Sequence, residues 1–122
     1  MPGRVFDTSC IVAQIEDEPG ADDVDALLKA GQEAGDAGAL SIVIPFIALM
    51  EVEYGLLRKY PSVQVERVLL AVQAWPVTTL ESSPNWRRAA AAVKARYRLS
   101  LADAWVAALA LMRDAELVHK SS

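Results

Sequence analysis

The sequence predicts an α/β fold in which a mostly parallel sheet of about four or five short strands lies between two layers of helices. Short apolar segments that suit buried strands alternate with longer segments of helical periodicity along the whole chain. The composition is that of a globular chain, because 53% of the residues are hydrophobic and the mean hydropathy is positive. At 122 residues, we expect a single domain, residues 1–122, with a hydrophobic core of its own.

The first strand candidate covers residues 5–6 and begins one or two residues earlier. Asp7 follows it directly. A helix is then expected over residues 9–14, with Thr8 or Ser9 as its cap, because a side-chain hydroxyl can accept a hydrogen bond from the first unpaired amides of a helix.

A helix and a strand are expected next. Asp22 or Asp23 is expected to cap this helix, which runs to about residue 34 with apolar residues at helical spacing. Pro19-Gly20 indicates a turn before it, and the two glycines within residues 35–38 end it. Residues 41–44, Ser-Ile-Val-Ile, then form a segment typical of a buried parallel strand, which Pro45 ends.

A long helix is expected over residues 46–59. Glu51, Gly55 and Arg58 follow i, i+4, i+7 spacing and share one of its faces. Its apolar residues form two further stripes, namely Ile47, Met50, Tyr54 and Leu57, and Leu49, Val52 and Leu56. We therefore expect little of this helix to be exposed.

The remainder of the chain continues the alternation, and each element has a local signal such as a cap or a proline. We expect a helix over residues 62–74, an edge strand over 75–78, a helix from Ser83-Pro84 to about Arg96, a helix from Ser100 to about residue 113 or 114, and a last strand over 116–119.

Three carboxylates stand where apolar segments end or turn into helices: Asp7, Glu51 and Asp103. A buried charge costs free energy unless it is paired or binds a metal, so three such carboxylates suggest one shared cation site. Ligands of parallel sheets bind beyond the carboxyl ends of the strands, where Asp7 is expected.

Each carboxylate also has a plainer explanation. Asp7 can end a strand or cap the following helix. Ser100 to Asp103 has the S-x-x-D form of a capping box. A solvated position explains Glu51 least well, because Glu53 already occupies a plausible exposed position on the same helix.

Several function classes are disfavoured. The net charge of −4 argues against a protein that coats nucleic acid by bulk charge. Glycine-rich phosphate loops are absent, and His119 is the only histidine, which argues against a histidine-rich zinc site.

The single cysteine, Cys10, cannot form an internal disulfide, which favours a cytoplasmic location. We expect it to be a small buried apolar residue. Apolar stretches fall well short of the ~18 residues of a membrane span, so no membrane association is expected.

Four sequence blocks together resemble the PIN-domain family and, within it, the short VapC-type toxins of bacterial toxin–antitoxin pairs. The order and separation of the blocks are more specific than any block alone. They are Asp7-Thr8-Ser9, Glu51-Val52-Glu53-Tyr54-Gly55, Ser100-Leu101-Ala102-Asp103-Ala104, and Leu117-Val118-His119-Lys120-Ser121.

The resemblance implies a three-layer α/β/α PIN-like fold and a metal-dependent endoribonuclease that cleaves single-stranded or structured RNA, as the toxin of a type II pair. Asp7, Glu51 and Asp103 would be the catalytic residues and the ligands of Mg²⁺ or Mn²⁺, and hard carboxylate oxygens suit these ions. Thr8, Ser9 and Ser121 would support them. A cognate antitoxin and a homodimer are implied as partners.

The sequence departs from the family pattern at the fourth acid, whose place is taken by Ser121, and we expect the last strand to be truncated. The alternative function is therefore a PIN-like module that binds RNA or protein with weak or no turnover. A phosphatase of the haloacid dehalogenase type, built on Asp7, is disfavoured because the second aspartate expected two residues later is Ser9.

Basic and aromatic residues could contact RNA. Arg58, Arg88 and Arg96 are the candidates for binding the RNA backbone, and the plainer explanation is an ordinary solvated helix face, as for most charge runs. Trp86 and Tyr97 could stack on bases, and the alternative is a place in the core or in an interface. The candidates for a homodimer interface, for which a core role is the alternative, are Leu56, Leu57, Val65, Leu69 and Leu70.

Overall fold

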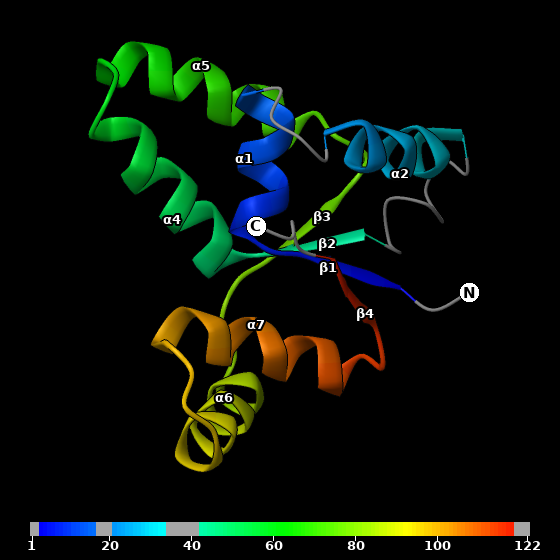
Figure 1. Ribbon diagram of the computed structural model, residues 1–122, viewed down its shortest axis with the longest axis vertical. Helices are drawn as coiled ribbons and strands as arrows, with labels where there is room; N and C mark the ends of the chain where they lie inside the picture. Colours follow the sequence, from blue (N-terminus) through cyan, green and yellow to red (C-terminus); the bar gives the residue numbers. More distant parts are fainter. Residues whose placement is uncertain (1–2, 17–20, 34–41, 119–122) are drawn as a thin grey trace.

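The computed structural model describes residues 3–16, 21–33 and 42–118, which form a parallel sheet with helices on both faces (Figure 1). The elements are β1 (Arg4–Phe6), α1 (Thr8–Glu16), α2 (Ala21–Glu33), β2 (Ile42–Pro45), α4 (Phe46–Leu57), α5 (Ser62–Gln73), β3 (Thr78–Leu80), α6 (Pro84–Arg96), α7 (Leu101–Met112) and β4 (Glu116–Val118). The predicted α/β class is confirmed.

The described strands form one sheet in the order β3-β2-β1-β4, and every neighbouring pair is parallel. In the register of the sheet, Val5 lies opposite Val43 on one side and Leu117 on the other. All the strands end at the same edge, so the residues after β1 and the helix after β2 begin side by side. This edge of the sheet holds the candidate site.

The two faces of the sheet have separate cores. Val5 and Phe6 are adjacent in β1 and both fully buried, and they point to opposite faces because side chains alternate along a strand. Phe6 packs with Ile44 beneath α1, α2, α4 and α5, whereas Val5 packs with Val43 against α6 and α7. Figure 1 shows the same division of the helices. The predicted three-layer α/β/α arrangement is confirmed.

Helix α4 follows β2 without a loop. Pro45 is both the last strand residue and the residue before the helix, with extended backbone angles of φ −72° and ψ 147°. A proline suits this position because the first amides of a helix have no partner within it. The direct join places α4 against the carboxyl edge of the sheet.

The prediction that both apolar stripes of α4 are covered is wrong. Val52 and Leu56 are buried, but Met50, Tyr54 and Leu57 are 51%, 58% and 48% exposed. Only one stripe of a helix can face the sheet, and the other remains on the outside. The exposed stripe includes residues close to Glu51.

The predicted edge strand is correct in its place in the sheet but wrong in its position in the sequence. Strand β3 covers Thr78–Leu80 at the end of the sheet, whereas residues 75–78 were expected. The chain turns before it, because Trp75 N donates to Val72 O and Val77 N donates to Trp75 O. Pro76 has no amide proton to donate to a ladder, which favours the turn.

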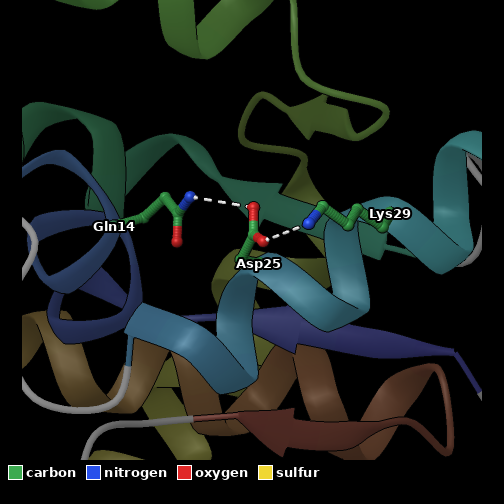
Figure 2. A network of polar contacts seen from close by, with 3 residues as sticks. All are labelled: Gln14, Asp25 and Lys29. Carbon is green, nitrogen blue, oxygen red and sulfur yellow. Dashed lines mark hydrogen bonds and ion pairs between the residues drawn. The ribbon is translucent and has the colours of Figure 1, made fainter.

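A polar network joins α1 to α2 (Figure 2). Gln14 Nε2 donates to Asp25 Oδ1 at 3.5 Å, and Asp25 Oδ2 pairs with Lys29 Nζ at 2.9 Å. The hydrogen bond with Asp25 raises the pKa of Lys29. Helix α2 begins at Ala21, slightly before the predicted cap, so that Asp22 falls in its first turn, where a carboxylate is favourable to the helix dipole.

Three aromatic rings fix α6 and α7 against the start of α4. Phe46, Trp86 and Trp105 meet edge to face, with centroid separations of 5.0 to 5.4 Å. Trp86 is 3% exposed, and its Nε1 donates to Trp105 O at 2.8 Å. The core explanation of Trp86 is therefore confirmed. The cluster sets the position of α7, which begins two residues before Asp103.

The remaining elements agree closely with the sequence. Ser83 caps α6 by accepting from Trp86 N, and Pro84 is its first residue. The predicted turn at Pro19-Gly20, the break at 35–38, His119 and Ser121 lie outside the described residues. No helix in the described ranges is long and apolar enough to cross a membrane.

Candidate active site

A pocket of about 390 Å³ opens at the carboxyl edge of the sheet. Asp7 reaches it from the end of β1, Glu51 from the middle of α4, and Asp103 from the first turn of α7. The structure thus places the three predicted carboxylates around one space. The described residues that line it are Asp7, Thr8, Ser9, Val12, Glu51, Asp103 and Val106.

Asp7 is held by the first turn of α1. Ser9 Oγ donates to Asp7 Oδ1 at 2.6 Å, and Cys10 N donates to the same oxygen at 3.3 Å. A hydrogen bond from a backbone amide in the first turn of a helix to the side chain of the residue just before the helix is the pattern of an N-cap. The prediction that Thr8 or Ser9 caps this helix is therefore wrong, since Asp7 does so. Asp7 caps α1 and lines the pocket at the same time.

Glu51 is held from across the pocket. Thr8 Oγ1 donates to Glu51 Oε1 at 2.8 Å, which joins the start of α1 to α4. Glu51 is half-buried, and none of the described residues is a buried polar or charged one. The expectation that these carboxylates lie in fully apolar surroundings is thus wrong, because they line an open pocket where water reaches them. Thr8 restricts how far Glu51 can turn within it.

Asp103 combines the two explanations open for it. Ser100 Oγ accepts a hydrogen bond from Asp103 N at 3.1 Å, so Ser100 caps α7 as the capping pattern predicts. That bond uses the amide of Asp103 and leaves its carboxylate exposed at the pocket. The position at a helix N-terminus stabilises the negative charge.

The donor set of the pocket fits Mg²⁺ or Mn²⁺, because all three charged groups supply hard oxygen atoms. Among the described residues, however, no three His, Cys, Asp or Glu side chains are grouped so that they could hold one ion between them. Asp7 and Glu51 each accept a hydrogen bond from a different hydroxyl, that of Ser9 and that of Thr8 respectively. The arrangement suits an ion that keeps several waters, as Mg²⁺ usually does, better than one enclosed by protein alone.

The three predicted RNA-binding arginines lie in two places, two on α6 and one directly after α4, and none is among the residues that line the pocket. Arg88 and Arg96 are exposed on α6. Arg58 directly follows α4, and seven residues separate it from Glu51, so the two lie on nearly the same helix face. Only Arg58 is therefore in line with a carboxylate of the site along one helix.

Sequence reasoning missed two apolar lining residues, Val12 and Val106. A signal was present, because Val12 lies one turn after Thr8 and Val106 lies three residues after Asp103, so each shares a helix face with a site residue.

The interface candidates divide into two groups. Leu56 and Val65 are buried and belong to the core, whereas Leu57 and Leu70 are 48% and 65% exposed. Leu69 is partly buried and packs against the core. Only Leu57 and Leu70 therefore remain open for contact with a partner.

Comparison with known proteins defines the class of this chain. The family model described as the PIN domain matches residues 4–121, so the chain belongs to the PIN domain family. The resemblance inferred from the sequence blocks is thereby confirmed.

Solved structures share this fold. A toxin–antitoxin complex from Klebsiella pneumoniae has a TM-score of 0.69 and 22% identity, and covers 98% of this chain and 87% of that chain. VapBC2 from Rickettsia felis, bound to a DNA fragment from their promoter, has a TM-score of 0.73 and 18% identity, with 97% and 87% covered. DNA-bound VapBC from Salmonella typhimurium has a TM-score of 0.64 and 21% identity, with 98% and 85% covered. No curated protein matches the sequence.

Proposed function

We propose that this chain is a metal-dependent endoribonuclease and the toxin of a type II toxin–antitoxin pair, with residues 1–122 as its single PIN-like domain. The observation that carries the proposal is the common pocket of Asp7, Glu51 and Asp103, which come from three separate elements. Membership of the PIN family supports it, because the three acids of the family's pattern that this sequence keeps, Asp7, Glu51 and Asp103, line this pocket.

The three carboxylates would hold Mg²⁺ or Mn²⁺ together with several waters that the ion keeps, because the described carboxylates are not grouped closely enough to hold it alone. When bound, such an ion activates water, orients the phosphodiester and stabilises charge on the leaving oxygen. Ser9 and Thr8 position Asp7 and Glu51 through hydrogen bonds of 2.6 and 2.8 Å. Asp103 stands at the exposed rim, where RNA would enter.

A cognate antitoxin and a second copy of the chain are proposed as protein partners. One of the similar structures is a toxin–antitoxin complex and two are VapBC assemblies bound to DNA, and the shared fold supports an equivalent protein partner here. Exposed Leu57 and Leu70 offer apolar surface for such contacts.

The proposal is tested with purified protein, a fluorescent single-stranded RNA and Mn²⁺ at low salt. We expect cleavage that EDTA stops and that Asp7→Asn or Glu51→Gln each reduces by at least about a hundredfold, as expected for loss of a principal catalytic interaction. Glu53→Gln is the matched control, because Glu53 is an exposed acid on the same helix and does not line the pocket. Undiminished cleavage by an Asp7→Asn/Glu51→Gln double variant would show that the site is elsewhere.

A second candidate function is a PIN-like module that binds RNA or protein without turnover. It is favoured by one observation: the described carboxylates are not grouped so that three could hold an ion. This function predicts RNA binding in both EDTA and excess Mn²⁺, with intact RNA recovered in each case. RNA shortened in Mn²⁺ but not in EDTA would rule it out.

A further inference from the structure

Tyr54 and Arg58 form a contacting pair on the outer face of α4. Arg58 Nη1 donates to Tyr54 Oη at 3.3 Å, and Arg58 Cζ lies 5.7 Å from the centre of the Tyr54 ring. Both residues are exposed, and Tyr54 is 58% exposed. The guanidinium is thus held beside a ring that remains accessible to solvent.

The pair lies further along α4 than Glu51, which reaches the carboxylate pocket from the same helix. Arg58 keeps helical angles, φ −73° and ψ −18°, so it continues the geometry of α4. Seven residues at ~1.5 Å each place it roughly 10 Å beyond Glu51 and almost on the same face. Tyr54 lies between them, one turn from each.

Gly55 has no side chain that could protrude from the surface of α4 between Glu51 and Arg58. It sits one turn after Glu51, and a Cβ built on it would meet nothing within 4 Å. Among the described residues, no atom beyond the chain neighbours comes close to Gly55, so this part of the face between the pocket and the Tyr54–Arg58 pair is open. An extended strand lying on α4 could reach both places.

The chemistry of the pair matches a nucleotide. An exposed tyrosine ring can stack on any base, and each such stack is worth about 5- to 150-fold in affinity. A guanidinium can contact phosphate oxygens in a planar, two-bond geometry that lysine cannot reproduce. Among the described residues, Arg58 has an aromatic partner of this kind, whereas no such contact is seen for Arg88 or Arg96.

We infer that Tyr54 and Arg58 form a subsite for one nucleotide of single-stranded RNA, next to the carboxylate pocket. Tyr54 stacks on the base, and Arg58 binds the adjoining phosphate. The subsite gives a preference for single strands, because a base inside a duplex is already stacked on both sides. The inference rests on the proposed ribonuclease function.

The test measures RNA binding separately from cleavage. The full chain is titrated, in EDTA and at low salt, against a fluorescent oligouridylate of about 12 nucleotides, within the usual size range of single-strand sites. We expect Tyr54→Leu to weaken binding about tenfold and Tyr54→Phe to change it by less than about threefold, because phenylalanine keeps the ring. Arg58→Ala should weaken binding and make it less sensitive to salt, and Arg58→Lys should restore only part of the loss.

Two controls separate a subsite from a general effect of charge or shape. Arg113→Ala removes an exposed arginine from the far end of α7, ten residues beyond Asp103, and should leave affinity nearly unchanged. Double-stranded RNA of the same length should bind wild type and Tyr54→Leu alike, because its bases cannot stack on the ring.

The outcomes distinguish the inference from the proposed function. If wild type binds and cleaves RNA but Tyr54→Leu does so equally well, the subsite is wrong and the ribonuclease stands. If wild type neither binds nor cleaves RNA, both are wrong. If Tyr54→Leu keeps its RNA affinity but changes the mass measured by light scattering, this face of α4 binds a second copy of the chain, which also overturns the inference.

Discussion

The hydroxyl of Thr8 donates a 2.8 Å hydrogen bond to Glu51 Oε1, across 43 residues of sequence. The bond spans the pocket from the first residue of α1 to the middle of α4. Its acceptor is a half-buried carboxylate, and hydrogen bonds to charged groups are stronger than those between neutral ones. Thr8 therefore acts as a positioning residue for Glu51.

We predict that Thr8→Val lowers both stability and RNA cleavage. Valine keeps the shape of threonine but cannot donate, so Glu51 loses a partner and turns more freely. The free energy of unfolding should fall by about 1–3 kcal/mol, and cleavage in Mn²⁺ by about tenfold. Urea unfolding and a timed cleavage assay measure the two effects.

Thr8→Ser is the control, because serine retains the hydroxyl and should restore most of the cleavage. A Thr8→Val protein that cleaves RNA like wild type would show that the bond does not orient Glu51 for the reaction.

Divalent ions should stabilise the fold through the same pocket. A ligand that binds only the folded state adds about 2.7 kcal/mol at a hundred times its dissociation constant. We therefore expect Mn²⁺ to raise the melting temperature by several degrees and Glu51→Gln to remove most of this shift. Glu53→Gln should keep the full shift. An equal shift in the Glu51 and Glu53 variants would place the ion outside the pocket.

Gly55→Ala should change stability and function in opposite directions. Glycine within a helix costs roughly 0.5–1 kcal/mol relative to alanine, and the space above Gly55 is open. The variant should therefore unfold at a higher urea concentration. A methyl group on the path from Glu51 to Arg58 should also weaken the binding of single-stranded RNA. Tighter binding by the more stable variant would contradict a path across this surface.

Cys10 should be inert in the folded protein and should make stability depend on alkaline pH. It is 1% exposed, and burial, with the nearby charge of Asp7, raises the pKa of its thiol from 9.0 to about 12. As the pH rises, the thiol of the unfolded chain therefore loses its proton at a lower pH than the thiol of the folded protein. The stabilisation is therefore complete below about pH 9 and is lost as the pH rises from 9 towards 12, by up to about 1.4 kcal/mol per pH unit.

Urea unfolding between pH 8 and pH 10.5 compares wild type with Cys10→Ala. The alanine variant should be less stable at pH 8 but should lose stability less steeply above pH 9. Identical slopes would mean that the thiol titrates alike in both states. Iodoacetamide should label wild type only after urea is added.

Local signals in the sequence were sufficient for elements with clear ends. Ser83 and Pro84 mark the start of α6 through a side-chain cap and a fixed φ, and both effects depend only on neighbouring residues. Asp7 could be placed beyond the carboxyl end of the sheet, because a short apolar strand directly precedes it.

The remaining features depend on packing between distant segments. Two apolar stripes of α4 were equally good in the sequence, and contact with the sheet selects Val52 and Leu56 over Met50 and Tyr54. The bond from Thr8 to Glu51 has no local signal at all, because it exists only after α1 and α4 are brought together. That the three carboxylates of the site share one pocket was therefore predictable, but their positioning contacts were not.

Trp86 should be essential to the layer that carries Asp103. Trp86→Phe keeps a ring against Phe46 but removes the 2.8 Å bond to Trp105 O and leaves that carbonyl without this donor. The lost hydrogen bond and the smaller buried side chain both destabilise the fold, so we expect the free energy of unfolding to fall by about 2–4 kcal/mol. Trp75→Phe is the control, because Trp75 is only partly buried and its replacement should cost less stability.

The near-ultraviolet circular dichroism signal should weaken more for Trp86→Phe than for Trp75→Phe, since the indole of Trp86 packs edge to face against Trp105. Because the cluster sets where α7 begins, the Mn²⁺-dependent rise in melting temperature should also shrink in Trp86→Phe and not in Trp75→Phe. Equal shifts in the two variants would mean that the position of Asp103 does not depend on this packing.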